Sequence, residues 1–557
     1  MDLNIRVAGE AGQGLKSTGA MLVEAFLDVG LHVFATQSYM SRIRGGLNWF
    51  DVRIADRELF GPREDVDLLV ALTVESMGVL RETVMPEGRI LLNGPPTEGV
   101  VSIDLDAAAR EMGGAIMANT VAAGAVFRML GYESQRLREG LRRRFGAKGD
   151  TVIQANIRCA IKGAEMVGTM SGDLLAPKCG EVTGQVASGT MAVGLGAAVA
   201  GVKFISAYPM TPSTGVFTYL AQVGDDYGIV VEQAEDEIAA ANMACGATYA
   251  GVPAMVTTSG GGFALMVESV SLAGMLELPV LYMVGMRPGP ATGMPTRTAQ
   301  QDLLFILHAG HGEFPRAIFA PGTHQQAYDL TRTALATAHQ FQTPAFLLID
   351  QFLADAEKNI PPLDATYRPI DRCIVQGGAD YRRYEPTESG VSPRAIPGGE
   401  AYVVVDSDEH TREGHLSESL QVRIEQQNKR MAKLAGMKAQ AMAPVLYGAA
   451  DAPTLLLCWG STYGPAREAV DLLNDVGMPT AILHFAQIWP MNEDAARSLI
   501  GRRERVISVE GNHTAQLASL LRMLGLVGPV EHLLRYDGMP FTGGEITQRV
   551  RNPQAQR

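Results

Sequence analysis

Cysteine is scarce in this chain, and its few cysteines are not grouped. The five are Cys159, Cys179, Cys245, Cys373 and Cys458, and no two of them form a CxxC pair. Zinc and iron–sulfur sites draw on closely spaced cysteines, and small disulfide scaffolds need many of them. We therefore expect no disulfide framework, and no metal or iron–sulfur site built by this chain alone.

Long uncharged runs and an excess of positive charge are also missing. No apolar run reaches membrane-spanning length, and the opening MDLNIRVAGEAG is typical of a strand and loop instead of a secretory signal. The formal net charge of −13 argues against a nucleic-acid-binding surface as the main function. These features predict a cytoplasmic enzyme or assembly subunit with no membrane and no nucleic-acid partner.

Length and composition predict several α/β domains. A chain of 557 residues is too long for one core, and 46% hydrophobic residues with 61 glycines suit α/β layers. Alternating strand and helix patterns predict doubly wound sheets. Composition shifts suggest five segments: a domain at 1–165, a linker at 166–187, a domain at 188–355, a connector at 356–445 and a domain at 446–557.

The first domain opens with a strand, a glycine loop and a helix. We expect the strand at residues 3–8 and the helix at residues 17–27, joined by GEAGQG. Such a loop can offer backbone N–H groups to a phosphate, but its GxxGxG spacing is not the dinucleotide fingerprint. A plain turn, an anion or carrier contact and a dinucleotide site stay open. The arginines of SRIRGG at 41–46 fit phosphate or carboxylate binding and ordinary salt bridges equally well.

Residues 230–251, VVEQAEDEIAAANMACGATYAG, hold the strongest candidate for a functional carboxylate. We expect the end of a buried strand and then a helix whose first turn is crowded with acids, which suit the exposed N–H groups there. That structural explanation fits Glu237 least well, because small residues share its side of the helix. These residues are Ala240, Ala241, Ala244 and Thr248. A carboxyl group held against such a face would lose solvation and suit proton sharing with a flat ligand.

Other candidates follow the predicted strands of the second domain. The strand at 203–207 leads to Thr211, the strand at 254–258 leads to a glycine loop, SGGG, and the strand at 280–285 leads to Arg287. Prolines on both sides of Thr211 could present its hydroxyl, or simply lead into a helix cap. If the sheet is parallel, these strand ends and Glu237 face one crevice.

The third domain offers one candidate, a histidine. Strands predicted at 454–459, 480–485 and 505–510 alternate with helices, and the last of them ends in EGNH. His513 could be catalytic, but a capped turn with a solvent-facing histidine explains it more simply.

Taken together, these segments resemble a known family. The blocks that carry the resemblance are, in order, GEAGQG (9–14), SRIRGG (41–46), AYPMTPST (207–214), EQAEDEIAAANMACGA (232–247), TTSGGGFALMVES (257–269), MRPGPATGMPTRTAQQDL (286–303), GVSPRAIPG (390–398) and VEGNHTAQL (509–517). Through them the chain resembles the α subunit, with the γ domain fused in front, of the 2-oxoacid:ferredoxin oxidoreductases, most closely the 2-oxoglutarate type, 2-oxoglutarate synthase. At 188–192 it departs from the family, with SGTMA where members often read GNEA.

The resemblance implies a fold, a reaction and a partner. The three domains would be a γ-like domain, a thiamine diphosphate pyrimidine-binding domain and a transketolase C-terminal-like domain. The reaction would convert 2-oxoglutarate and coenzyme A to succinyl-CoA and CO2, with electrons passed to ferredoxin, and would be reversible in principle, as in a reductive TCA cycle. A β subunit, in an (αβ)2 heterotetramer, would hold the diphosphate, its Mg²⁺ and a [4Fe–4S] cluster.

The resemblance also implies residue roles. Glu237 matches the thiamine-activating glutamate, whose carboxyl group hydrogen-bonds to N1′ of the aminopyrimidine. Thr211 matches the threonine that contacts the 2-oxoacid, and Arg287 the arginine that pairs with its C1 carboxylate. Arg297 is our hypothesis for the distal carboxylate of 2-oxoglutarate. Further contacts are expected from Tyr208, Pro209, Ser259, Gly260, Gly261 and Phe263 to the cofactor, and from Gly12, Gly14, Arg42 and Arg44 to coenzyme A or a partner.

Two alternatives stay open. A pyruvate or branched-chain 2-oxoacid:ferredoxin oxidoreductase is the nearer one, because Arg297 alone does not settle the substrate side chain. A non-catalytic assembly subunit is the other, and the joint presence of Thr211, Glu237 and Arg287 counts against it.

Overall fold

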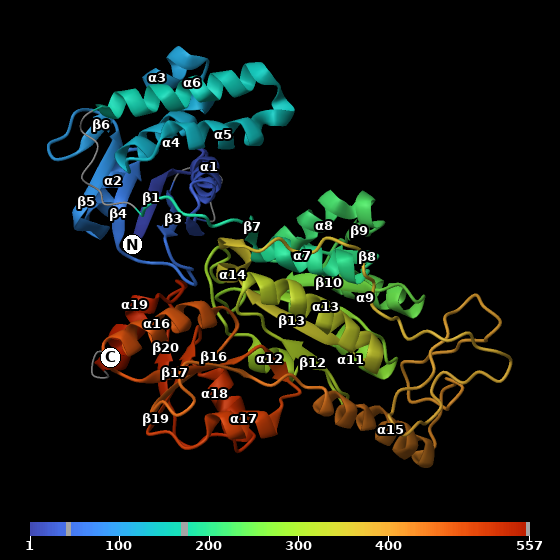
Figure 1. Cartoon of the computed structure of the whole chain (residues 1–557). Helices are drawn as coiled ribbons and strands as arrows, with labels where there is room; N and C mark the ends of the chain where they lie inside the picture. The colour runs from blue at the N-terminus through green and yellow to red at the C-terminus, as the bar shows by residue number, and fades with distance from the viewer. Residues whose placement is uncertain (41–45, 169–176, 553–557) are drawn as a thin grey trace. The chain divides into compact units, whose positions relative to one another are not determined.

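The computed structural model describes residues 1–40, 46–168 and 177–552 (Figure 1). The chain divides into two compact units. Unit 1 comprises residues 1–187, 355–362 and 542–544, and unit 2 comprises residues 188–354, 363–541 and 545–557. Within the described ranges, no helix combines the length and apolar character that crossing a bilayer requires.

Unit 1 is built on an eight-stranded mixed sheet in the order β6-β5-β4-β1-β3-β2-β14-β7. The strands are β1 (Asp2–Glu10), β2 (His32–Ser38), β3 (Leu47–Ala55), β4 (Val66–Ala71), β5 (Val84–Asn93), β6 (Val101–Ile103), β7 (Gln185–Ser188) and β14 (Glu357–Ile360). β1, β4, β5 and β6 run parallel, whereas β3 is antiparallel to both β1 and β2. The expected strand at the N-terminus is confirmed, but the expected alternation of strands and helices fails at β3 and β4, which follow each other without a helix in the described residues 56–65.

The helices of unit 1 pack on this sheet around an aromatic core. They are α1 (Leu15–Asp28), α2 (Val74–Leu80), α3 (Leu105–Met112), α4 (Ala118–Met129), α5 (Ser134–Phe145) and α6 (Asp150–Val167). Phe26 of α1 stacks on Phe127 of α4 with ring centroids 5.0 Å apart. Gly19 lets α1 approach β3, because a Cβ there would overlap the ring of Phe50.

Unit 2 contains a seven-stranded sheet in the order β18-β12-β13-β11-β10-β8-β9. The strands are β8 (Phe204–Ala207), β9 (Val230–Gln233), β10 (Ala254–Ser259), β11 (Leu281–Met286), β12 (Ala317–Phe319), β13 (Ala345–Asp350) and β18 (Gln487–Trp489). All pairings are parallel except that of β12 with β18. The expected parallel sheet is therefore confirmed, and its strands end at one edge.

The helices of this part of unit 2 correct two local expectations. They are α7 (Gly189–Ala200), α8 (Thr214–Tyr227), α9 (Glu237–Tyr249), α10 (Gly260–Phe263), α11 (Val267–Met275), α12 (Leu303–Leu307), α13 (His324–Phe341) and α14 (Gln351–Asp355). The predicted glycine loop after β10 is the short helix α10. The predicted buried strand before Glu237 is wrong in its burial, because β9 is the edge strand and Val230 is 60% exposed.

A second, five-stranded sheet completes unit 2, in the order β15-β17-β16-β19-β20. Its elements are β15 (Val445–Tyr447), β16 (Thr454–Trp459), α16 (Tyr463–Asp475), β17 (Thr480–Phe485), α17 (Glu493–Ile500), β19 (Arg505–Glu510), α18 (Gln516–Met523), β20 (Glu531–Leu534) and α19 (Gly543–Arg551). One buried hydrophobic cluster includes residues of both sheets, among them Ile318 and Trp459. The two sheets of unit 2 therefore share a core.

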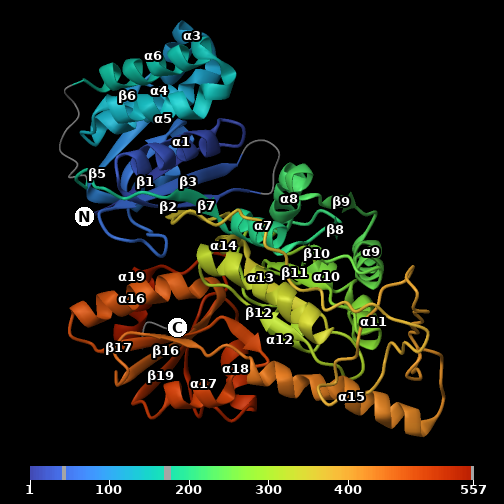
Figure 2. The same cartoon turned by 45° about the vertical axis from the view of Figure 1, so that its right-hand side comes forward.

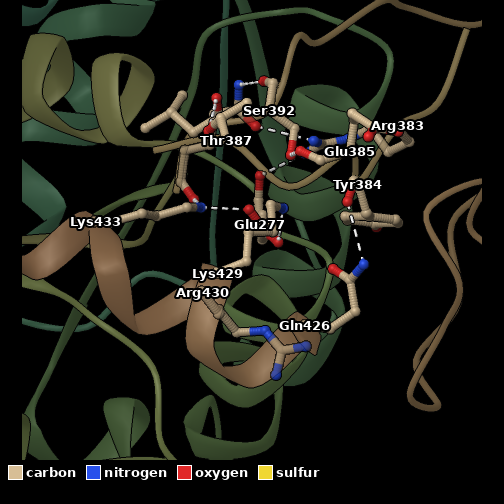
Figure 3. A network of polar contacts seen from close by, with 12 residues as sticks. Glu277, Arg383, Tyr384, Glu385, Thr387, Ser392, Gln426, Lys429, Arg430 and Lys433 are labelled. Carbon is tan, nitrogen blue, oxygen red and sulfur yellow. Dashed lines mark hydrogen bonds and ion pairs between the residues drawn. The ribbon is translucent and has the colours of Figure 1, made fainter. Parts of the chain in front are cut away.

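The connector of unit 2 is irregular until it reaches α15 (Leu420–Ala439), as Figures 1 and 2 show. A buried ionic cluster fastens it to the end of α11 (Figure 3). Glu277 binds Lys429 at 2.6 Å and Lys433 at 2.5 Å, and the three side chains are each 1% exposed. Arg383 donates to the Glu277 carbonyl at 3.0 Å. The connector is thus tied to the sheet domain by charge pairs in addition to apolar packing.

Candidate active site

Glu237 is the first residue of α9 and is buried, with 4% of its surface exposed. The preceding Asp236 performs the capping role, because its carboxylate accepts from the Ala239 N–H at 2.8 Å. Glu237 is therefore not needed to cap the helix. The small face predicted on its side of α9 is confirmed as buried, and its members are Ala240, Ala241, Ala244 and Thr248.

The Glu237 carboxyl group lies close to a glycine of α10, Gly262. A Cβ on Gly262 would come within 2.6 Å of Glu237 Oε1 and would also overlap Thr258 Oγ1. Among the described residues, nothing donates to this buried Oε1. Leaving a buried carboxylate oxygen unpaired costs on the order of 1–3 kcal/mol or more, so the group is suited to accept from a ligand.

Thr211 and Arg287 are brought together by neighbouring loops. Arg287, one residue beyond β11, donates through Nη1 to the Thr211 carbonyl at 2.8 Å. Gly285 permits this approach, because a Cβ there would come within 2.9 Å of Pro212. Arg287 is 9% exposed, and burial lowers its pKa while Asp302 raises it. One hydrogen bond uses only part of a guanidinium with five N–H donors, so the rest can bind an anion.

Arg287 lines a cleft of about 600 Å³. Gly260 and Gly261 of α10, together with Asp302 and Phe305, form part of its wall, and Asn512 and His513 contribute from the loop after β19. Because the cleft combines a cation, amides and an aromatic ring, it suits a small anionic molecule. His513 is exposed, as the simpler interpretation of its sequence predicts.

The remaining predicted residues of unit 2 lie in several environments. Tyr208 and Pro209 are exposed, whereas Ser259 is buried and its hydroxyl has no partner among the described residues. Phe263 is fully buried in an aromatic cluster with Phe305 and Phe346. Arg297 is partly buried beside Met539, with Nη1 3.9 Å from the Met539 sulfur, and is not among the residues that line the cleft.

The candidate residues of unit 1 include two glycines with positive φ angles. Gly12 and Gly14 have φ angles of 93° and 78°, which favour glycine, and Gly14 precedes α1. A Cβ on Gly14 would overlap the side chain of Asn119. Arg42 and Arg44 lie outside the described residues.

The sequence prediction missed one buried acid of the cleft, Asp302. It directly precedes α12, where an aspartate is usually explained as a helix cap. Burial raises the pKa of its carboxyl group to about 6, while Arg287 opposes that rise. The only signal in the sequence was its place in the block that follows Arg287, which could not show its burial. Elsewhere, among the residues that the structure describes, no group of three or more His, Cys, Asp or Glu side chains is placed to hold a metal ion.

Comparisons with known proteins agree along the whole chain. Residues 195–429 match the family described as pyruvate flavodoxin/ferredoxin oxidoreductase, thiamine diphosphate-binding, and residues 4–166 match the pyruvate ferredoxin/flavodoxin oxidoreductase family. A 2-oxoacid:ferredoxin oxidoreductase subunit alpha from a Sulfolobus species is 30% identical over 99% of this chain and 96% of that protein. The 2-oxoglutarate oxidoreductase subunit KorA of Mycobacterium tuberculosis is 27% identical over 99% of this chain and 92% of its own.

A solved structure gives the same result. The 2-oxoglutarate:ferredoxin oxidoreductase from Magnetococcus marinus, with 2-oxoglutarate, coenzyme A and succinyl-CoA bound, aligns over 100% of both chains. The TM-score is 0.92 at 30% sequence identity. The α/β fold predicted from the sequence is therefore shared by that enzyme over its full length.

Proposed function

Because this chain belongs to the family of 2-oxoacid:ferredoxin oxidoreductase α subunits, we propose that it is the α subunit of a coenzyme A-dependent 2-oxoglutarate:ferredoxin oxidoreductase. The reaction oxidatively decarboxylates 2-oxoglutarate to succinyl-CoA and CO2 and passes two electrons to ferredoxin. The observation that carries the proposal is the buried, unpartnered Glu237 carboxyl oxygen beside the strand ends that bring Thr211 and Arg287 together.

The residues around Glu237 fit the aminopyrimidine of thiamine diphosphate. An acceptor oxygen without a protein partner suits a ring nitrogen that must share a proton, and Gly262 leaves the room beside it that a side chain would fill. When bound, thiamine diphosphate supplies the carbon nucleophile that attacks the 2-oxo group and stabilises the charge left when CO2 departs. Glu237 holds the proton at the pyrimidine nitrogen, and its burial excludes water as a competing partner.

Thr211 and Arg287 act on the 2-oxoacid. The free donors of Arg287 bind the C1 carboxylate, and the hydrogen bond to the Thr211 carbonyl fixes the guanidinium in place. The 2-oxoacid loses this C1 carboxylate as CO2. The ion pair with Arg287 must therefore bind the substrate and still allow the neutral CO2 to leave. The residues proposed to contact the cofactor, besides Glu237, are Tyr208, Pro209, Ser259, Gly260, Gly261 and Phe263.

Arg297 and the N-terminal domain complete the proposal. Arg297 binds the distal carboxylate of 2-oxoglutarate, and the loop of Gly12 and Gly14, with Arg42 and Arg44, contacts coenzyme A or a partner. The division into domains at 1–165, 188–355 and 446–557, with a linker and a connector between them, also stays a proposal. The parallel sheet that contains β8 to β13 supports the pyrimidine-binding assignment of the second.

The chain works with a β subunit in this proposal. That subunit holds the diphosphate, its Mg²⁺ and a [4Fe–4S] cluster, pairs with this chain in an (αβ)2 assembly, and delivers electrons to ferredoxin in the cytoplasm. The scattered cysteines of this chain support the division, because they offer no cluster motif.

Co-expression with the β-subunit gene tests the function. The purified complex is assayed without oxygen for viologen reduction with coenzyme A and a panel of 2-oxoacids. We expect 2-oxoglutarate to give the highest kcat/KM. A preference for pyruvate or branched-chain 2-oxoacids would move the assignment to those oxidoreductases, and no turnover with any 2-oxoacid would favour the assembly subunit.

Glu237→Gln tests the role of the carboxyl group. The amide keeps the shape of the side chain but cannot share the proton in the same way. We expect the variant complex to assemble and bind thiamine diphosphate, yet to exchange the thiazolium C2 proton slower by about 10²-fold or more, as loss of a general acid–base group costs. Exchange at the wild-type rate, measured by NMR after incubation in deuterated buffer and an acid quench, would remove Glu237 from the mechanism.

A further inference from the structure

Asp302 precedes α12 but does not cap it. Its side chain accepts no hydrogen bond from that helix. The N–H group of Leu304 donates instead to Gln516 Oε1 at 2.9 Å, and Gln516 also donates to the Gln301 carbonyl at 2.6 Å. A glutamine from α18 therefore performs the capping that an aspartate at this position ordinarily supplies, and the Asp302 carboxyl group is free for another role.

The Asp302 carboxyl group lies on the wall of the cleft, in space that a side chain at Gly260 would occupy. A Cβ on Gly260 would come within 2.6 Å of Asp302 Oδ2 and 2.8 Å of Oδ1, so only glycine allows this approach. The residue is 9% exposed, and its buried Oδ2 has no partner among the described residues. Asp302 nevertheless lines the same cleft as Arg287. An unpaired buried oxygen on a cleft wall is costly for folding, and a bound ligand would offset that cost.

The carboxyl group and the guanidinium share the cleft without forming an ion pair in the described part of the chain. Arg287 is directed to the Thr211 carbonyl, and it acts on Asp302 only through its charge. Burial is the larger influence and raises the pKa of Asp302 to about 6. The carboxyl group is therefore protonated in part near neutral pH, when it can donate a hydrogen bond as well as accept one.

We propose that Asp302 is a further substrate-binding residue, whose protonated carboxyl group donates a hydrogen bond to the 2-oxoacid that Arg287 holds by its carboxylate. This inference rests on the proposed function, because it takes a 2-oxoacid as the ligand of the cleft. In the ionised form Asp302 repels the same anion. The 2-oxoacid is thus bound at two positions. Arg287 contributes a permanent positive charge, and Asp302 contributes a hydrogen-bond donor that is lost when its carboxyl group ionises.

Binding by Arg287 and protonated Asp302 predicts that affinity for the 2-oxoacid falls as pH rises. Three elements that line the cleft near Asp302 contribute only uncharged groups. These groups are Gly260 and Gly261 of α10, Phe305 of α12 and Gln516 of α18. The charged or titratable groups are Arg287 beyond β11 and His513 beyond β19. Arginine keeps its charge across this range, and His513 lines the same cleft, so a variant of His513 serves as the control.

The test measures binding of N-oxalylglycine, a dicarboxylate with the same oxo-carboxylate end that does not react. Calorimetry on the complex of this chain with its β subunit gives Kd from pH 5 to pH 8. We expect Kd of the wild type to rise by about tenfold per pH unit above the pKa of Asp302, or about a hundredfold by pH 8. D302N, which donates a hydrogen bond at every pH, should bind with a flat profile. D302A should also be flat but weaker at pH 5, and H513Q should keep the wild-type slope.

The outcomes separate this inference from the function. A flat wild-type profile, a wild-type slope in D302N, or a slope abolished in H513Q would each overturn the role of Asp302 while leaving the binding of a 2-oxoacid intact. Absence of binding in the wild type at every pH would overturn both the inference and the proposed substrate site. Thermal unfolding of each variant complex at the wild-type temperature shows that a change in Kd reflects the cleft and not the fold.

Discussion

Glu277→Gln should destabilise unit 2 strongly, because the glutamate is the counter-charge shared by two buried lysines, Lys429 and Lys433. Burial alone would raise the pKa of Glu277, but Lys429 and Lys433 outweigh it and hold the pKa below its usual range. The carboxylate is therefore ionised in the folded protein, at 2.6 Å from one ammonium and 2.5 Å from the other. Figure 3 shows both lysines reaching from α15 toward the single glutamate. Burial lowers the pKa of both lysines, that of Lys433 to about 7, and Glu277 opposes this change. The amide would therefore leave buried ammonium charge uncompensated or force the lysines to give up their protons.

The magnitude follows from burial. Removing one partner of a buried pair costs about 3–5 kcal/mol, because the remaining charge is left desolvated and uncompensated. All three side chains are 1% exposed, so neither lysine can turn its charge to water without opening the connector. A typical domain is stable by only about 5–15 kcal/mol, so the substitution removes a large fraction of the total. The same reasoning predicts that Glu277→Leu with Lys429→Met and Lys433→Met together is close to neutral.

The assay follows unfolding of the full-length chain in urea, together with amide hydrogen exchange of residues 420–439. Glu277→Gln should lower the midpoint and speed exchange in α15, and the triple variant should restore both. Glu531→Gln is the matched control, because Glu531 binds Arg505 at a similar distance of 2.8 Å but is 41% exposed. Surface pairs contribute about 0–1 kcal/mol, so this control should change little. A Glu277→Gln variant no less stable than the control would refute the reasoning.

Three further predictions concern the site and the core. Gly262→Ala should fold but lower thiamine diphosphate affinity, measured by calorimetry, because its Cβ would come within 2.6 Å of Glu237 Oε1; unchanged affinity would contradict the fit described above. Arg297→Met should raise KM far more for 2-oxoglutarate than for 2-oxobutyrate, and equal effects in steady-state assays would reject Arg297 as the distal contact. Burial raises the pKa of Asp350 to about 6, so this carboxyl group stabilises the fold below pH 4 and loses that contribution as pH rises through 6. Between pH 3 and pH 7, Asp350→Asn should therefore gain up to about 3 kcal/mol in the free energy of unfolding relative to wild type, measured in urea, and parallel pH profiles would disprove it.

The sequence predicted what local spacing controls. The helix that begins at Glu237, its small buried face and the strands that precede Thr211 and Arg287 depend on residues a few positions apart, so periodicity was sufficient. Local spacing does not distinguish an edge strand from a central one, because the neighbouring strands come from distant parts of the chain. The Val-Val pair of β9 therefore predicted a buried strand, although Val230 is exposed at the sheet edge.

Tertiary packing explains the features that the sequence could not reveal. Three glycines in a row favour a loop, yet α10 is helical there, with Gly260 against Asp302 and Gly262 against Glu237. These glycines, which lack a side chain, allow the two carboxyl groups to approach the α10 backbone closely, and they do not make the segment flexible. Likewise, Glu277 is separated from Lys429 by 152 positions, and no short-range pattern connects them. The role of Asp302 was also hidden from the sequence, because the side chain that accepts from the start of α12 is Gln516 of α18.

The five-stranded sheet contributes to the cleft through the loop between β11 and α12. Gln300 in this loop donates to the Trp459 carbonyl at 2.7 Å, accepts from the Gly511 N–H at 2.8 Å, and receives the Asn512 amide on its own carbonyl at 3.1 Å. These three bonds hold the segment that leads directly to Asp302. Because Arg287 begins the same loop, the spacing between the cation and the acid depends on this anchoring. The C-terminal part of unit 2 therefore acts as a positioning element for the cleft, even though the residues expected to bind thiamine come from the seven-stranded sheet.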